Sequence, residues 1–241
     1  LENLGVECIK GEAKIISPWS VETNGKILST RSIIVATGAQ PFVPHIKGID
    51  QLKYLTSDNL WDIRELPKRL IVLGGGPIGC ELSQAFARLG SQVTQIEILS
   101  RIMIKEDNEV ASLLTKKFED EGIDIRTDHV AKEIVIEGNK KKLICEKQNE
   151  TVEIQFDEIL IAIGRTANSN GLGLEELGVK LNPNKTVHVN EKLQSSISNI
   201  YACGDVAGPY QLTHTASHQA WHATVNALFG RLKSFKVDYS V

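Results

Sequence analysis

Short runs of branched aliphatic residues recur along the chain, and most of them end in a glycine or another turn former. Runs of this kind predict buried β-strands. We place such strands at residues 32–36, 70–73, 93–97, 158–163, 187–189 and 199–202.

Three helices are predicted from apolar residues at helical spacing and from end signals. The first begins at Pro77, where the missing N–H is harmless, and Gly90 can end it. The second covers residues 107–121 and the third 213–229. In the second we expect one buried stripe, with Asp107 as N-cap and Gly122 as the stop; the stripe is Val110, Leu113, Leu114 and Phe118.

The segments 133–137, 141–147 and 151–156 are strand-like but partly polar, and two-residue turns join them. They predict an antiparallel β-meander. Together with the buried strands and helices, this meander predicts an α/β fold.

Residues 74–79 (GGGPIG) fit the pattern G-x-G-x-x-G between a buried strand and a helix. Glu97 ends the next strand, 18 positions after Gly79, which is typical of a dinucleotide-binding βαβ unit. Gly74 is expected to make the tight turn, Gly76 to let a pyrophosphate approach, and Gly79 to let the helix pack closely. The helix N-terminus offers N–H groups to the phosphates. The alternative is a glycine-rich turn without a ligand.

Glu97 is expected to accept hydrogen bonds from the adenosine ribose. Its charge would repel a 2′-phosphate and so favours NADH over NADPH, although Arg101 could offset part of that repulsion. A solvated carboxylate at a strand end is the alternative for Glu97.

Three further motifs follow buried strands, namely residues 36–38 (ATG), 162–168 (AIGRTAN) and 201–205 (YACGD). With the glycine motif they make the chain resemble the pyridine nucleotide–disulfide oxidoreductases over nearly its whole length. Residues 210–216 (YQLTHTA) are most similar to the mercuric reductase and dihydrolipoamide dehydrogenase branch.

The resemblance implies two Rossmann-like folds, each with a β-meander crossover, in which an NAD domain is inserted into a split FAD domain. Residues 1–66 would be the tail of the first half of the FAD domain, 67–190 the NAD domain and 191–241 the second half of the FAD domain.

The resemblance also assigns residues to FAD. Asp205 would bind a ribitol hydroxyl, which suits an acceptor-only carboxylate. Leu212 and Thr213 would place N–H groups near the flavin pyrimidine and stabilise charge on the reduced ring. Thr37 and Gly38 would lie near FAD. A plain turn at Thr37 and a capping role for Asp205 stay open.

On the nicotinamide side, Glu81 would pair with a lysine beside the flavin, which would make it the catalytic candidate, and Ile78 would face the same pocket. Gly164 would contact NAD. The alternative for Glu81 is a purely structural role, in which its charge interacts favourably with the helix dipole. The alternative for Arg165 is an ion pair with an acidic residue at the surface.

The implied activity passes hydride from NAD(P)H to FAD and then electrons to a small disulfide or a metal ion. The family's cysteine pair, its FAD glycine motif and its lysine belong before Leu1, and its interface domain would begin near Asp238. We therefore expect an internal piece of a homodimeric enzyme that binds NADH, holds FAD weakly and is inactive alone. A cysteine-free NADH oxidase, a ferredoxin-reductase-like flavoenzyme and an NADH-binding redox sensor are the alternatives.

The formal net charge of −3 gives no basic footprint for nucleic acid, and no apolar run approaches the roughly 18 residues of a membrane span. The four cysteines are widely spaced, so we expect buried thiols in a reducing compartment, the cytoplasm. His214, His218 and His222 share a helix face, but no further ligands accompany them, and we predict no metal site.

Overall fold

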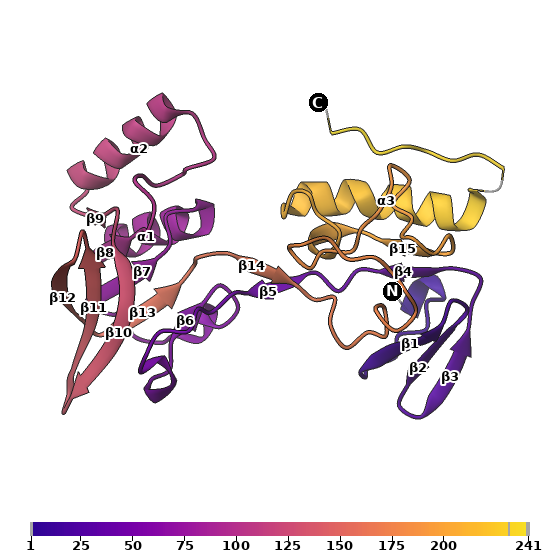
Figure 1. Cartoon of the computed structure of the whole chain (residues 1–241), viewed down its shortest axis with the longest axis horizontal. Coiled ribbons are helices and arrows are strands. Elements are labelled where there is room, and N and C mark those ends of the chain that lie inside the picture. The colour runs from indigo at the N-terminus through magenta and orange to yellow at the C-terminus, as the bar shows by residue number, and fades with distance from the viewer. Residues whose placement is uncertain (1, 231, 240–241) are drawn as a thin grey trace. The chain divides into compact units, whose positions relative to one another are not determined.

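The structure is a computed structural model that describes residues 2–230 and 232–239. It has two compact units (Figure 1), a central unit, Pro41–Arg165, and a terminal unit, Leu1–Gln40 with Thr166–Val241. Where the chain passes between them, β5 (Ala39–Pro41) and β14 (Arg165–Ala167) pair as a two-stranded sheet. The sequence predicts an NAD domain at residues 67–190. Its limits concern cofactor binding and not compactness, so they stay a prediction.

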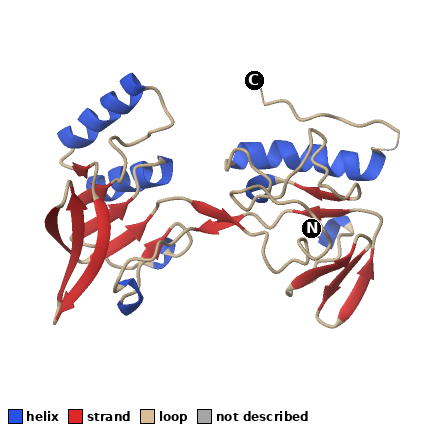
Figure 2. Ribbon diagram, in the orientation of Figure 1, coloured by secondary structure: helices blue, strands red, loops and turns tan. Residues whose placement is uncertain are grey.

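The central unit is built on a five-stranded sheet in which every neighbouring pair is parallel (Figure 2). Two α-helices, α1 (Pro77–Leu89) and α2 (Asn108–Asp120), connect its strands. The predicted α/β class is thereby confirmed. The sheet order is β6 (Leu55–Thr56), β13 (Glu158–Ile161), β7 (Arg69–Leu73), β8 (Gln92–Ile96) and β9 (Asp124–Arg126), with short 3₁₀ turns η2 (Ile49–Gln51) and η3 (Leu60–Asp62) preceding β7.

Strand β7 is buried on both faces because different layers cover them. Leu70 and Val72 pack in a cluster with the helix side chains Phe86 and Phe118. Ile71 and Leu73 point to the other face and pack with residues of the predicted meander. The meander is β10 (Val130–Glu137), β11 (Lys140–Lys147) and β12 (Glu150–Phe156), paired antiparallel as expected.

In the terminal unit, β4 (Ile33–Val35) and β15 (Ile200–Ala202) pair as parallel strands. Their buried residues pack in one core cluster with Ile15, which belongs to a separate antiparallel sheet of three strands. Helix α3 (Thr213–Phe229) has the predicted bounds. The antiparallel sheet consists of β1 (Ala13–Ser17), β2 (Ser20–Thr23) and β3 (Lys26–Ser29), and the 3₁₀ turns are η1 (Glu2–Leu4) and η4 (Gly204–Val206).

The predicted stripe of α2 is wrong at two positions. Val110 and Leu113 are 57% and 72% exposed, whereas Ala111 and Phe118 are buried and Leu114 packs against the core cluster that contains Phe118. The buried row is therefore rotated by about one residue. Asp107 precedes the helix as N-cap, but its side chain makes no capping hydrogen bond.

Three smaller expectations are also corrected. Residues 187–189 form only an isolated bridge from Val187 to Leu181, and the Val187 N–H donates to the carbonyl of Val206 in the terminal unit rather than to a neighbouring strand. The strand predicted at 158–163 ends at Ile161, and Ile163 is exposed. Cys8 lies exposed in the N-terminal segment, while Cys80, Cys145 and Cys203 are buried.

The rotated stripe makes a stability prediction. Phe118→Ala should lower the free energy of unfolding by roughly 3–5 kcal/mol, because it empties a fully buried site. Leu113→Ala on the same helix should change it by less than about 0.5 kcal/mol. Urea unfolding followed by circular dichroism measures both, and equal losses would contradict the observed helix orientation.

Candidate functional site: a glycine turn and its acidic neighbour

The glycine motif forms the turn between β7 and α1, at the carboxyl end of the parallel sheet. Gly74 has a φ of 116°, a left-handed conformation that favours glycine, and its N–H donates to the carbonyl of Ile96 at 2.8 Å. Gly76 is the N-cap of α1 and has no side chain to accept from the first-turn N–H groups, and Pro77 follows at the first helical position. Those groups are the usual partners of an anion.

The three glycines of the G-x-G-x-x-G pattern, Gly74, Gly76 and Gly79, face different surroundings. A Cβ on Gly79 would collide with the carbonyl oxygen of Gly74, and a Cβ on Gly74 would collide with the carbonyl oxygen of Ala162. These two glycines are therefore required by the packing of α1, β7 and β13. A Cβ on Gly76 would meet nothing within 4 Å, so this position is open on the protein side.

The carboxylate of Glu97 lies against the turn from the end of β8. One oxygen accepts from the N–H of Gly75 at 2.6 Å, and the other accepts from the N–H of Leu99 at 2.8 Å. An ionised carboxylate has about four acceptor positions, so two remain for further hydroxyl donors. Glu97 is half-buried, so it both binds the backbone of the turn and remains partly accessible to a ligand.

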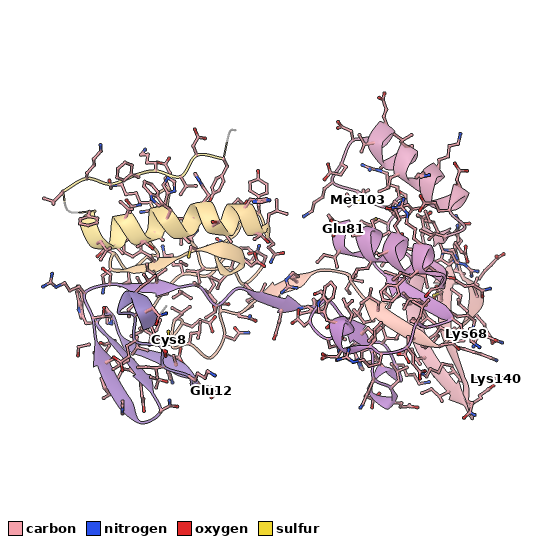
Figure 3. All side chains as sticks on the ribbon, turned by 180° about the vertical axis from the view of Figure 1, so that it is seen from behind. Cys8, Glu12, Lys68, Glu81, Met103 and Lys140 are labelled. Carbon is pink, nitrogen blue, oxygen red and sulfur yellow. The ribbon has the colours of Figure 1, made fainter. Side chains whose placement is uncertain are left out.

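The segment after Glu97 folds over the turn. The N–H of Met103 donates to the carbonyl of Gly75 at 2.6 Å, and Ile102 is buried beside it. Figure 3 labels Met103 there, together with Glu81 on α1. Arg101 donates to the carbonyls of Met103, Ile104 and Glu106, each at 2.9 Å.

The remaining nucleotide-side candidates take different positions. Ile78 is half-buried and Glu81 exposed on the first turns of α1. Gly164 has a φ of 144°, its carbonyl accepts from the N–H of Phe42 at 3.0 Å, and its Cβ side is open. Arg165 pairs with Asp58 at 3.7 Å and donates to the hydroxyl of Ser57 at 3.0 Å, so the acid partner considered for it is present.

In the terminal unit, the Thr37–Gly38 turn is bound to Asn168 by three hydrogen bonds. The Thr37 hydroxyl donates to the Asn168 carbonyl at 2.7 Å, and the Asn168 amide side chain donates to the Thr37 carbonyl at 3.0 Å. The Asn168 N–H donates to the Gly38 carbonyl at 2.9 Å. Two of the quoted motifs thus meet within one unit.

Asp205 lies half-buried in η4, and a residue that the sequence analysis missed supports its loop. Gln219 is fully buried on α3, accepts from the N–H of Gly204 and donates to the carbonyl of Gly208, both at 2.6 Å. It also donates to the Tyr239 hydroxyl at 2.6 Å. Leu212 is the exposed N-cap of α3, and Thr213 begins the helix.

The comparisons with known proteins agree with these motifs. The family model "Pyridine nucleotide-disulphide oxidoreductase" matches residues 1–220. The chain belongs to this family.

The relatives named below are about twice as long as this chain. It is 34% identical to the mercuric reductase of Lysinibacillus sphaericus, over all of this chain and 44% of that protein. It is 38% identical to the dihydrolipoyl dehydrogenase of Thermus scotoductus, over 92% of this chain and 49% of that protein. The HOCl-induced flavoprotein disulfide reductase RclA of Escherichia coli superimposes with a TM-score of 0.84 at 30% identity, over 95% of this chain and 52% of that one. The chain thus spans about half the length of these relatives.

The three buried cysteines are poor nucleophiles in this family member. Burial raises the pKa of Cys80 and Cys203, and it raises that of Cys145 to about 11. All three therefore stay protonated at neutral pH. Within the described residues no cysteine is paired in a disulfide.

Two of the three histidines on α3, His218 and His222, are in ring contact. The rings of His218 and His222 lie 4.4 Å apart, and Nδ1 of His222 is 2.9 Å from the carbonyl of His218. Within residues 2–230 and 232–239, no group of three or more histidine, cysteine or acidic side chains could hold a metal ion.

No helix in the described part of the chain combines the length and apolar character needed to cross a membrane.

The glycine geometry predicts a larger loss of stability for one variant than for another. Gly79→Ala should destabilise the chain by about 1–3 kcal/mol, since its methyl group meets a backbone carbonyl that cannot move aside. Gly76→Ala should cost less than about 1 kcal/mol, because its φ of −79° and its open surroundings accept any residue. Urea unfolding measures the free energy of unfolding of both variants. Equal losses in the two would contradict the close approach of α1 to β7.

Proposed function

We propose that this chain carries the NADH-binding part, and some of the FAD-binding part, of a flavin-dependent oxidoreductase. The whole protein would pass hydride from NADH to FAD and on to a small disulfide or a metal ion. The names of the relatives support this reaction class, because they include a mercuric reductase and a flavoprotein disulfide reductase.

The observation that carries the proposal is the open position of Gly76 at the N-terminus of α1. A ligand phosphate can approach the backbone only where no side chain intervenes, and Gly76 is the one glycine of the three whose Cβ side is empty. Ile78 and Gly79 would present N–H groups to that phosphate. The neighbouring Glu97 keeps acceptor capacity for the ribose.

Glu97 also supports a preference for NADH. A 2′-phosphate on the ribose would place two negative charges close together. Arg101 already donates to three carbonyls of its own loop, so its guanidinium is committed to that loop rather than to a phosphate.

The terminal unit fits the remaining part of a flavin site. Asp205 would accept from a ribitol hydroxyl, while Leu212 and Thr213 would direct helix N–H groups at the ring. Thr37 and Gly38 would border the cofactor. Bound flavin would supply the hydride acceptor. On the central unit, Ile78, Glu81 and Gly164 would border the nicotinamide.

The acceptor and the assembly follow from the family rather than from this chain. We propose a small disulfide or a metal ion as acceptor, a homodimer as the whole protein, and the reducing cytoplasm as its location. No redox-active cysteine pair lies within the described residues, so the chain alone should bind NADH and show no turnover of a disulfide. A measured kcat for disulfide reduction by the 241-residue chain would contradict this.

The principal test is Gly76→Val. The added side chain should lower NADH affinity at least tenfold, which is about 1.4 kcal/mol, because it occupies the space of the phosphate. Ala85→Val places the same side chain on the exposed face of α1 and should leave affinity unchanged. Isothermal titration of the folded chain measures both, and equal affinities for NADH in the two variants would refute the site.

The cofactor preference has its own test. The wild-type chain should bind NADH at least tenfold more tightly than NADPH at low ionic strength, and the ratio should shrink as salt screens the charges. Glu97→Gln keeps an acceptor oxygen for the turn but removes the charge, so the ratio should fall toward one. A ratio that is independent of salt and of Glu97 would assign the discrimination to another residue.

A further inference from the structure

Beneath the glycine turn lies a side chain that the nucleotide motif does not include. Gln95 is on β8, is fully buried, and its Nε2 lies 3.0 Å from the carbonyl oxygen of Gly74. A carbonyl can only accept, so the Gln95 amide nitrogen is the donor. The same nitrogen is 3.5 Å from the sulfur of Cys80. Its position is therefore under both the turn and the first turn of α1.

Gln95 and Glu97 hold opposite ends of one peptide group. The carbonyl of Gly74 and the N–H of Gly75 belong to the same planar trans peptide and point in opposite directions. Gln95 donates to the carbonyl, and Glu97 accepts from the N–H at 2.6 Å. Glu97 directly follows β8, two positions after Gln95, so the two side chains leave the extended chain on the same side. Rotation of this peptide would break both hydrogen bonds.

The carbonyl of the next peptide, that of Gly75, is also bound by groups of the protein. The carbonyl of Gly75 accepts from the backbone N–H of Met103 at 2.6 Å and lies 3.5 Å from the Cys80 sulfur. Both carbonyl oxygens of the turn are thus bound to protein donors. A carbonyl turned toward a phosphate would repel it, whereas the N–H groups of α1 attract it.

The choice of residue indicates that Gln95 does more than fill space. Its Oε1 atom is buried and has no hydrogen-bond partner among the described residues. Leaving a buried amide oxygen unpaired is unfavourable, and an apolar side chain of similar size would avoid that cost. The donor function toward Gly74 is the feature that an apolar residue would lack.

We infer that Gln95 is a positioning residue for the dinucleotide, which keeps the Gly74–Gly75 peptide turned so that its carbonyl faces the protein and not the pyrophosphate. This inference rests on the proposed NADH site. Gln95 acts through the backbone and does not touch the ligand.

The test uses two variants of matched size in the full 241-residue chain. Gln95→Met removes the donor. Gln95→Glu restores a donor only while the introduced carboxyl is protonated, and burial raises the pKa of such a group. Gln92→Met, at an exposed position of the same strand, is the control. Affinity for NAD⁺, which tolerates mild acid, is measured by calorimetry from pH 5.5 to 8.

Gln95→Met should bind NAD⁺ about tenfold more weakly than wild type at every pH, and Gln92→Met should bind like wild type. Gln95→Glu should approach wild-type affinity at pH 5.5, because the protonated form is the one that can donate, and should lose it as the pH rises. Taking each ratio to wild type at the same pH cancels the effects of pH that all variants share.

The inference is overturned if Gln95→Met binds like wild type, or if Gln95→Glu is as weak as Gln95→Met at pH 5.5. If wild type itself binds no NAD⁺, the proposed function fails as well, which is a distinct result. Should the variants not fold, nuclear magnetic resonance of the wild-type chain decides. The side-chain amide protons of Gln95 should then exchange slowly with solvent, and rapid exchange would overturn the assignment.

Discussion

The close approach of α1 to β7 is the constraint on which the central unit depends. The carbonyl of Gly74 lies directly against the Cα of Gly79, with no space for a Cβ between them. This contact directs the helix N-terminus over the carboxyl end of the sheet. It also directs the Gly74 carbonyl into the core, where only a buried donor can form a hydrogen bond with it. The position of α1, the exposure of Gly76 and the burial of Gln95 are three consequences of the same contact.

The carboxylate of Glu97 links that constraint to ligand chemistry. Motif reasoning assigns Glu97 to the ribose alone, yet its two oxygens also bind the N–H groups of Gly75 and Leu99. A substitution chosen only to change cofactor preference would therefore also loosen the turn. Glutamine removes the charge and keeps one acceptor oxygen for the turn, so it disturbs the turn less than alanine would and is the more informative substitution.

The sequence was sufficient for features that local patterns determine. The βαβ unit, the meander and the bounds of α3 follow from apolar spacing, glycines and turn residues. The orientation of α2 did not follow, since Val110 and Leu113 fit a helical stripe with Phe118 as well as Ala111 does. Only tertiary packing decides between two stripes that are one residue apart. The residues gave no signal for β1 to β3, whose short strands are largely exposed, and the resemblance alone implied them.

The two buried glutamines, Gln95 and Gln219, were out of reach for a related reason. In sequence, each is one of several polar residues on its element, most of which are at least partly exposed, and nothing local marks it as buried. Their common role becomes visible only in three dimensions, because each binds backbone groups of a glycine loop in its own unit. An amide suits this position since it can donate without a charge, and an isolated charge at full burial would be far more costly. The charged carboxylates, Glu97 and Asp205, remain half-buried at the rims of the loops. Each unit thus holds its loop with a neutral buried amide, which leaves charge at the partly exposed positions where a polar ligand can meet it.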